Sequence, residues 1–235
     1  MKKLLFLLII IIFTGGTGYT QIINEATSKK LTTGIDIYTN IWLDLPDGIK
    51  QGAVNPGLSF FMLYDFQLGD KNLFFSPGLA ISTHNLHHNG LFVVDTNNNT
   101  QFPVFKDVYP DINYNTNRFS LTYVDIPLEF WFNSKSGVRF AAGFKVGFLL
   151  QSSIKYSGDD YLYGTDDNLK FKLYKIKNID PYRYGLILRG GWKWLHLYGY
   201  YSLSNVFVKG TGPEMFPISV GATIRPLKSW QKKNK

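Results

Sequence analysis

The chain of 235 residues contains no cysteine. This absence excludes disulfide bonds, thiolate metal sites, a cysteine nucleophile and a bacterial lipid anchor attached through cysteine. An exported protein of this size without disulfides must take its stability from its own sheet and core, or from lipid. Its stability therefore depends on how apolar residues are arranged along the chain.

Long apolar runs are missing after Phe13. No later segment approaches the 18 or so apolar residues that a membrane-spanning helix needs, and the mean hydropathy of −0.08 excludes a protein with several such helices. Charged residues make up only 18% of the chain and aromatic residues 17%. This balance is unusual for a water-soluble domain, and it is typical of a transmembrane barrel in which every second residue meets lipid.

A nucleic-acid-binding pattern is also missing. The net charge is +8, but the basic residues are spread along the chain except in the C-terminal segment Lys228–Lys235. Without a basic helix or an aromatic RNA-binding motif, we expect no nucleic acid partner. Nothing in the sequence points to a cofactor, so none is expected.

The N-terminus has the order of a secretory signal. Lys2 and Lys3 precede the apolar run Leu4–Phe13, and small and polar residues follow up to Thr20. We predict a signal peptide over residues 1–20, cleaved near Thr20–Gln21, and a short periplasmic segment over residues 21–30. A membrane anchor that is retained at the N-terminus is the alternative interpretation.

Val138–Gln151 is the most informative segment. Its even positions are all apolar, whereas its odd positions include Arg139, Lys145 and two glycines. Successive side chains of a strand point to opposite faces, so one face here is apolar and the other is polar. About 9–11 tilted residues cross a bilayer as a strand, so this segment predicts a wall between lipid and a polar interior.

Seven more segments show strand patterns, which brings the total to eight: 31–43, 57–68, 73–83, 119–132, 182–193, 195–203 and 217–225. The connections between the eight alternate in length. Those at 44–56, 84–117, 156–181 and 204–216 are long, and those at 69–72, 133–137 and 193–194 are short. Outer-membrane barrels have an even number of strands, short periplasmic turns and longer external loops. A soluble β-sandwich, the alternative, gives no reason for all long loops to lie at one end.

The predicted fold is therefore all-β: an eight-stranded antiparallel up-and-down transmembrane β-barrel over residues 31–226, with long external loops and short periplasmic turns. Residues 227–235 form a basic C-terminal tail. The predicted location is the outer membrane of a Gram-negative bacterium. We expect a monomeric barrel in contact with outer-membrane lipid.

Charged residues occupy the inward faces of this predicted barrel. We expect them to form an interior ionic network, because charges cannot remain unpaired in a dry interior: Asp125, Glu129, Arg139, Lys145, Arg183 and Arg189. An eight-stranded barrel is just wide enough to be filled by side chains, so a structural plug is favoured over an ion-conducting pore. Aromatic residues near strand ends suggest interfacial girdles: Trp42, Tyr64, Trp131, Tyr182, Trp192 and Trp194.

Several polar clusters have the chemistry of a site, but we assign none of them as catalytic, cofactor-binding or metal-binding. His84, His87 and His88 have metal-ligand chemistry, but no carboxylate lies beside them, which favours an incidental polar loop. A lipid-modifying enzyme could use a rim histidine, and the candidates are His84 and His196 with Ser82, Ser202 or Asp95 as partners. The acidic pairs 159–160 and 166–167 lack the spacing of a calcium loop.

Tyr123–Phe130, with the sequence Tyr-Val-Asp-Ile-Pro-Leu-Glu-Phe, resembles a characteristic strand of PorT-type outer-membrane β-barrel proteins of the Bacteroidetes. The glycine-rich segment 142–147 and the last strand 218–224 are similar to that family as well. The resemblance implies an outer-membrane barrel with a role in or beside the type IX secretion and gliding apparatus. The long second external loop and the tail after the last strand depart from the family pattern.

These observations lead to the expectation of a non-enzymatic outer-membrane protein that acts as a structural or partner-binding component. The partners would be other envelope or secretion-system proteins. The alternatives from other classes are a barrel enzyme acting on lipids, and a small channel or binder of hydrophobic ligands.

Overall fold

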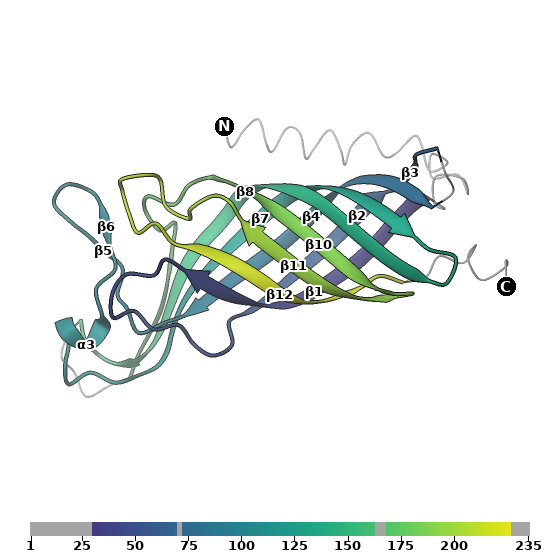
Figure 1. Ribbon diagram of the computed structural model, residues 1–235. Helices are drawn as coiled ribbons and strands as arrows, with labels where there is room; N and C mark the ends of the chain where they lie inside the picture. Colours follow the sequence, from purple (N-terminus) through teal and green to yellow (C-terminus); the bar gives the residue numbers. More distant parts are fainter. Residues whose placement is uncertain (1–29, 70–71, 163–167, 227–235) are drawn as a thin grey trace, which may run out of the picture.

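The alternating segments of the sequence form the strands of a closed barrel (Figure 1). The computed structural model describes residues 30–69, 72–162 and 168–226. The barrel has eight strands: β1 (Leu31–Leu43), β2 (Pro56–Tyr64), β4 (Leu73–His87), β7 (Tyr114–Asn133), β8 (Val138–Asp159), β10 (Tyr182–Trp192), β11 (Leu195–Ser202) and β12 (Phe216–Ile224). Each pairs antiparallel with its neighbours in this order, and β12 pairs with β1 to close the sheet. The predicted fold class is confirmed.

Smaller elements decorate the barrel. A two-residue strand β3 (Phe66–Gln67) extends the β2–β4 end, and β5 (Val93–Val94) with β6 (Thr100–Gln101) forms a separate two-stranded sheet. The short helix α3 (Phe105–Val108) and the strand β9 (Asn168–Tyr174) lie near the same end as the long loops (Figure 1).

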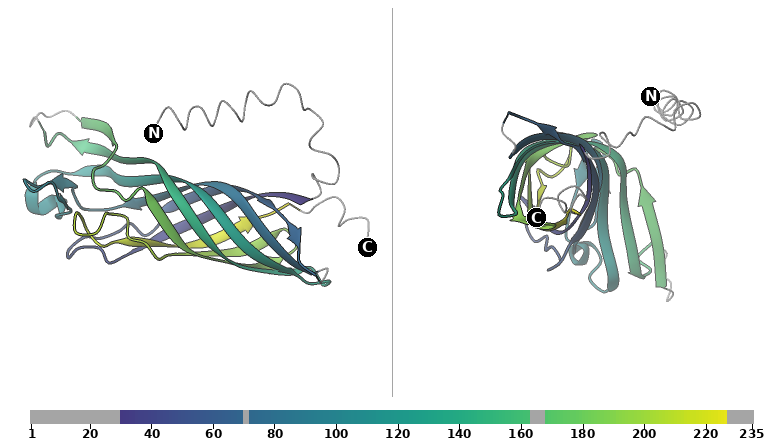
Figure 2. Two further views of the ribbon diagram at one scale, coloured as in Figure 1. Left: turned by 90° about the horizontal axis from the view of Figure 1, so that it is seen from above. Right: turned by 90° about the vertical axis from the view of Figure 1, so that its right-hand side faces the viewer.

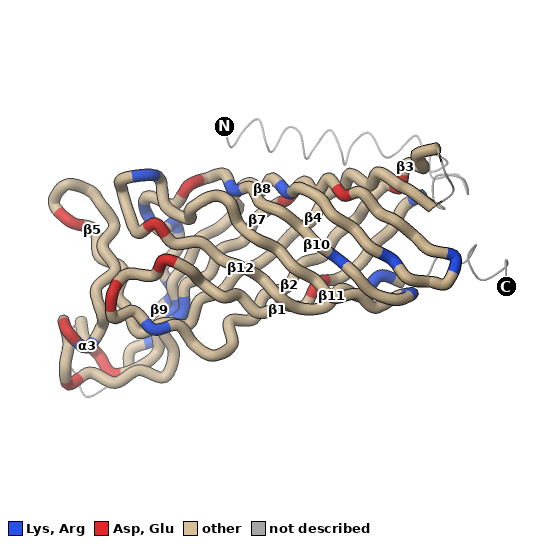
Figure 3. Tube along the Cα trace, in the orientation of Figure 1, with Lys and Arg blue, Asp and Glu red and all other residues tan. Residues whose placement is uncertain are grey.

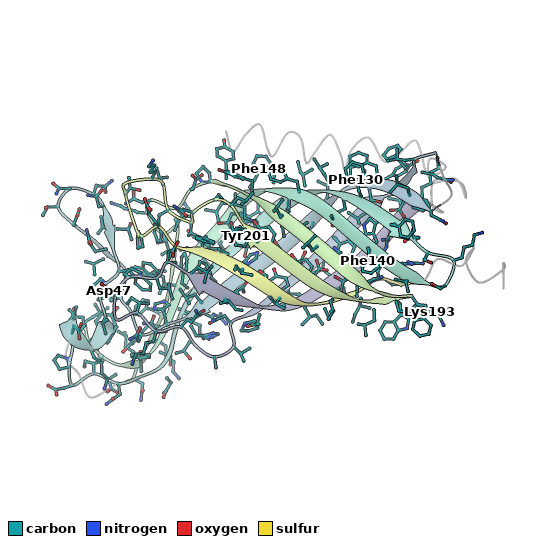
Figure 4. All side chains as sticks on the ribbon, viewed as in Figure 1. Asp47, Phe130, Phe140, Phe148, Lys193 and Tyr201 are labelled. Atoms are coloured by element: carbon teal, nitrogen blue, oxygen red, sulfur yellow. The ribbon has the colours of Figure 1, made fainter. Side chains whose placement is uncertain are left out.

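Each barrel strand buries every second residue. In β1, Asp36 and Asn40 are buried, whereas Ile37 and Ile41 are 54% and 43% exposed. Figure 4 shows Phe130, Phe140 and Phe148 pointing away from the barrel, and together with similar residues they form an apolar outer belt. Polar residues inside and apolar residues outside are the reverse of a soluble protein, as expected for a wall that faces lipid.

The predicted aromatic girdles are only partly correct. Trp192, Trp194 and Tyr182 are at least half exposed on the outside. The prediction is wrong for Trp42 and Trp131, which are buried inside the barrel because they lie on the inward side of β1 and β7.

The short turns lie together at one end of the barrel, where β1 starts and β12 finishes (Figure 1). In the β7–β8 turn, the Ser134 amide donates to the carbonyl of Val138 at 2.8 Å, and Gly137 has a φ of 90° that favours glycine. At the β10–β11 turn, Lys193 has a φ of 53°. The long connections leave from the other end, as the loop lengths predict.

The predicted limits of several elements are wrong. β4 continues to His87, β7 begins at Tyr114 and β8 continues to Asp159, so parts of the predicted loops 84–117 and 156–181 are strand. Strand β9 also lies within the second of these loops. Most of the extra residues of β4, β7 and β8 are polar, so these extensions show no long apolar alternation, and β9 alternates over only seven residues.

The predicted strand 57–68 is interrupted at Asp65, between β2 and β3. The predicted signal peptide over residues 1–20, nearly all of the segment 21–30 and the tail 227–235 lie outside the described residues. Among the helices of the described ranges, none is long and apolar enough to cross a membrane.

Candidate functional site: the barrel interior and the external flap

The centre of the barrel contains a buried ion pair between Asp125 of β7 and Arg183 of β10. The guanidinium donates from Nη2 and Nε to the Asp125 carboxylate at 2.7 and 3.1 Å, and Nη2 also donates to Ser82 at 2.6 Å. The Ser82 hydroxyl donates to the same carboxylate. Lys145 Nζ lies 3.7 Å from Asp125 and donates to the Tyr198 hydroxyl at 3.3 Å. These charges are therefore compensated by one another and by hydroxyl groups.

A second ion-pair cluster is built around Arg189 of β10. Its guanidinium pairs with Asp36 of β1, with a second nitrogen 3.1 Å from the carboxylate, and lies 3.3 Å from Glu129 Oε1. Thr223 accepts a hydrogen bond from Arg189 at 2.7 Å. Trp131 donates its indole N–H to Glu129 Oε2 at 2.9 Å. Residues from four strands are thus tied together across the lumen.

A third cluster closes the end of the barrel that carries the short turns. Arg225 lies 3.1 Å from Asp65, which also accepts hydrogen bonds from Thr32 and Ser76 at 2.7 and 2.8 Å. The Arg225 guanidinium stacks 4.0 Å from the centre of the Trp131 ring. This cluster explains the strand break at Asp65, because the carboxylate turns inward to meet Arg225.

The structure places all six residues of the predicted ionic network in the buried interior, and five of them form the ion pairs described above. The sixth, Arg139 of β8, is buried opposite Gly191 of β10. Sequence reasoning missed Asp36, Asp65 and Arg225. The signal for them was present, since Asp36 and Arg225 occupy the polar faces of predicted strands and Asp65 occupies the mixed face of its strand.

Apolar side chains fill the other half of the interior. A buried cluster beneath the long loops contains Trp42, Ile49, Leu86, Phe102, Phe119, Leu121, Tyr123, Ile179, Val206, Phe207 and Met215. Several of these come from loops that fold back into the barrel mouth. Between this cluster and the ion pairs, a cavity lined in part by His84, Tyr123 and Arg183 has a volume of about 10 Å³. That volume holds at most a single water molecule.

The three neighbouring histidines lie in different environments. His84 points into the barrel, is fully buried, and its Nδ1 lies 2.7 Å from Asn40 Oδ1. His87 is on the opposite face of β4, and His88 packs edge-on against Phe92 and Phe102 in the loop cluster. The interpretation as a polar loop is wrong for His84 and His87, which belong to β4. Among the described residues, no group of three or more potential ligands could hold a metal ion.

His88 directly follows the end of β4 and lies among the packed loops. Burial among apolar rings lowers its pKa to about 3, although the nearby carbonyl of Gly90 acts in the opposite direction. The partly exposed Asp95 of the β5–β6 loop behaves differently: the Asn99 amide, which donates to it at 2.8 Å, lowers its pKa.

The residues considered for lipid chemistry are not brought together. His196 packs its ring against Trp131, near the end with the short turns, and Ser82 is held by Asp125. The Ser202 hydroxyl donates a hydrogen bond to the carbonyl of Ser204. Of the acidic pairs, Asp159 Oδ2 accepts the amide of Asn113, Asp160 accepts that of Leu162, and 166–167 lie outside the described residues.

Two strands continue past the barrel rim, and a third strand pairs with them there. We call this sheet the external flap: residues 114–119 of β7, 153–159 of β8 and all of β9. In the right-hand view of Figure 2, along the barrel, the flap stands to one side of the ring. Its inner face packs an aromatic cluster. Tyr156 lies 5.7 Å from Phe105 and 5.5 Å from Phe171 between ring centres, and Tyr161 closes the group.

Comparison with known proteins identifies the family of the barrel. A family model described as an outer membrane protein beta-barrel domain matches residues 11–208. Two similar solved structures are those of Ail, the attachment invasion locus protein of Yersinia pestis, alone and in complex with the heparin analogue sucrose octasulfate. Their sequences are 13% and 12% identical, and each match covers 83% of this chain and 97% of that one with a TM-score of 0.37. No curated protein matches the sequence.

Proposed function

The chain belongs to the family of outer membrane protein β-barrel domains, and from that premise we propose that it is a non-catalytic component that binds another envelope protein through its external flap. The barrel lies in the outer membrane. Its interior is filled by ion pairs and loop side chains, so the surface available to a partner is at the ends of the barrel. At the external end the flap continues the barrel sheet, whereas β5 and β6 form only a separate two-residue ladder.

The free edge of β9 carries this proposal. Within the described ranges, β9 pairs with β8 on one side only, and its outer edge has no neighbouring strand. Lys175 donates its amide to the Ser152 carbonyl of β8 at 3.0 Å. The backbone amides of an antiparallel strand point alternately toward and away from the neighbouring strand. The amides of Lys170 and Lys172 therefore face away from β8. Such an edge can accept a strand from another protein.

The sequence resemblance suggests which partner this is. Tyr123–Phe130 is similar to the characteristic strand of PorT-type proteins, and the partner we propose on that basis is a component of the type IX secretion and gliding apparatus. We propose that the barrel itself is monomeric. The closed sheet supports this, because β1 and β12 pair within the one chain and leave no open edge in the membrane-spanning part.

The absence of a catalytic role is part of the proposal. It is supported by the positions of the two histidines considered for lipid chemistry. His84 is fully buried and hydrogen-bonded to Asn40, and His196 is buried against Trp131. Neither ring is placed at the rim, where a lipid headgroup would have to react.

A matched pair of variants at one position tests the proposed edge. Lys170→Pro removes an outward-facing amide without removing a hydrogen bond to β8, whereas Lys170→Gln removes only the charge. A photo-crosslinking amino acid at Leu173, which is 54% exposed, would be used in native cells with both variants, and the same amino acid at Val54, 65% exposed, serves as the control site.

We expect one envelope protein to be captured at Leu173, lost in Lys170→Pro and retained in Lys170→Gln. The purified captured protein should then bind the purified barrel with the same dependence. Capture that is equal in both variants, or equal at Val54, contradicts docking at the edge. If the captured protein is unrelated to secretion and cells without the barrel secrete normally, the type IX assignment is wrong.

A further inference from the structure

A row of basic residues crosses the outer face of the sheet beyond the barrel rim. His87 of β4 lies opposite Arg118 of β7, Arg118 lies opposite Lys155 of β8, and Lys155 lies opposite Lys172 of β9. Lys170 stands on the same face of β9, opposite Ser157. Figure 3 shows basic positions gathered around β9 at this end of the molecule.

This arrangement is unfavourable by itself. Directly opposite residues have Cβ atoms roughly 4.5–5.5 Å apart, and like charges at that separation destabilise a sheet. The ion pairs found among the described residues all lie inside the barrel and involve none of these side chains. Moreover, Arg118 Nε is buried without a hydrogen-bond partner. The closely spaced positive charges and the unpaired Arg118 Nε can therefore bind an anion.

A β-bulge brings the row onto one face. Along β7 the even residues point outward, from Ile126 in the apolar belt to Arg118. In β8 the outward side chains of the belt are also even, but the pairing shifts by one residue where Tyr123 faces Leu149 and Thr122 faces Gln151. After this shift the odd residues face outward, and Lys155 therefore stands beside Arg118 instead of pointing inward.

The position of the row relates it to the membrane. Lys155 follows Leu150, a 53% exposed residue of the apolar belt, on the same side of the sheet. At about 3.3 Å per residue and a tilt of about 40°, the row stands roughly 13 Å above the belt. Lysine and arginine side chains are long enough to reach back toward the lipid headgroups while their aliphatic stems lie along the sheet.

We propose that this row binds the phosphate groups of outer-leaflet lipid and so fixes the external flap against the membrane surface. The occupant is lipid and not a soluble polyanion, because the row is on the face that continues the lipid-facing belt. The opposite face of the flap is covered by its own aromatic cluster. Closely spaced cations of this kind form charge-assisted hydrogen bonds with phosphate oxygens. The row lies on the outer face of the sheet, so its binding of lipid does not depend on docking at the β9 edge.

The test compares lipid retained by the barrel after reconstitution. The protein is placed in vesicles of phosphatidylcholine that contain a bisphosphorylated glucosamine glycolipid, and the lipids that remain bound are identified by native mass spectrometry. The variant combines Arg118→Gln, Lys155→Gln and Lys172→Gln. The matched control removes the same charge from exposed lysines of the loops and of α3 through Lys50→Gln, Lys106→Gln and Lys209→Gln.

We expect the wild type and the loop control to retain the phosphorylated glycolipid in preference to phosphatidylcholine, and the row variant to lose that preference by roughly tenfold to a hundredfold. The dephosphorylated glycolipid should show no preference. The heat-dependent gel mobility of a folded barrel, measured for each variant, ensures that folded proteins are compared.

Two results would overturn the proposal. One is equal glycolipid retention by the row variant and the loop control. The other is binding of a soluble sulfated polysaccharide that depends on the row while no lipid preference exists, which would assign the row to a polymer outside the membrane.

Discussion

Asp125 accepts hydrogen bonds from Arg183 and Ser82 in the interior of the barrel, with Lys145 close by. Burying such a group of charges gains little net free energy, but removing one partner leaves an uncompensated charge in a place that water cannot reach. At the scale of the residue, therefore, the ionic interior specifies which strands lie next to one another more than it adds to stability.

Asp125→Asn keeps the size of the side chain and removes its charge. We expect the free energy of unfolding to fall by about 3–5 kcal/mol, because Arg183 and Lys145 lose their buried counter-charge. Ser82→Ala, which removes one hydrogen bond at the same place, should cost only about 1 kcal/mol. Urea unfolding in lipid vesicles, followed by tryptophan fluorescence, measures both; equal losses in the two variants would show that charge is not the important property.

His88 makes the packed loops sensitive to acid. Its pKa is about 3 in the folded loops, against about 6.5 when it is exposed, so opening of the loops takes up a proton between these values. The contribution to stability is complete above pH 6.5 and is lost as the pH falls toward 3, by about 1.4 kcal/mol per pH unit.

Hydrogen exchange of the segment 90–102 at pH 7.5 and 4.5, corrected for intrinsic rates, measures this effect. We expect the free energy of opening to be about 2–3 kcal/mol lower at pH 4.5. In His88→Gln, which cannot titrate, the difference should vanish. A fall of the same size in that variant would assign the acid sensitivity to another group.

At the scale of the element, β7 and β8 have two parts with different surroundings. Their barrel parts alternate apolar and polar residues, whereas their external parts pair Thr116 with Ser157 and Asn117 with Tyr156. The alternation made the barrel parts predictable from sequence. The external parts were predicted as loop, because polar strands of this kind are stabilised by the neighbouring strand and not by a periodic apolar face.

The external flap should depend on its aromatic cluster and not on the barrel. Tyr156→Ala removes a buried ring that contacts Phe105 and Phe171, and we expect the free energy of opening of β9 to fall by about 3 kcal/mol. Hydrogen exchange should rise in β9 and stay unchanged at residues 144–148 of β8. Tyr174→Ala, which truncates a 55% exposed ring, should change the free energy of opening of β9 by less than about 0.5 kcal/mol. Faster exchange throughout the barrel would mean that flap and barrel unfold together.

At the scale of the whole molecule, the alternation of short turns and long loops orients the barrel in the membrane. The three short turns lie at the end where β1 starts and β12 finishes, and the loops and the flap lie at the other. Short turns face the periplasm in outer-membrane barrels, so the flap is expected to face the outside of the cell.

The absence of cysteine allows a direct test of this orientation, since a single introduced cysteine is the only thiol in the chain. Val54→Cys lies in the β1–β2 loop, and Ser136→Cys lies in the β7–β8 turn; both positions are exposed. A membrane-impermeant maleimide should label the first in intact cells and the second only after the outer membrane is permeabilised. Labelling of Ser136→Cys in intact cells would reverse the orientation.

The sequence by itself determined the architecture. Residues such as Phe140, Phe144 and Phe148 alternate with Arg139 and Lys145, and the pleat of a strand translates this order directly into an outside and an inside. The same rule placed Asp125, Glu129 and Arg183 in the interior. No knowledge of neighbouring strands is needed for that step, because the period of two is a property of each strand alone.

Only the tertiary structure decided which side chains meet. The ion pair of Arg189 with Asp36 joins residues far apart in the chain, and the stagger between strands that aligns them is set by the whole closed sheet. The bulge in β8 likewise places Lys155 beside Arg118, and the break at Asp65 depends on Arg225 being opposite. Such contacts depend on register and closure, which are properties of several strands together and leave no periodic pattern in any single one.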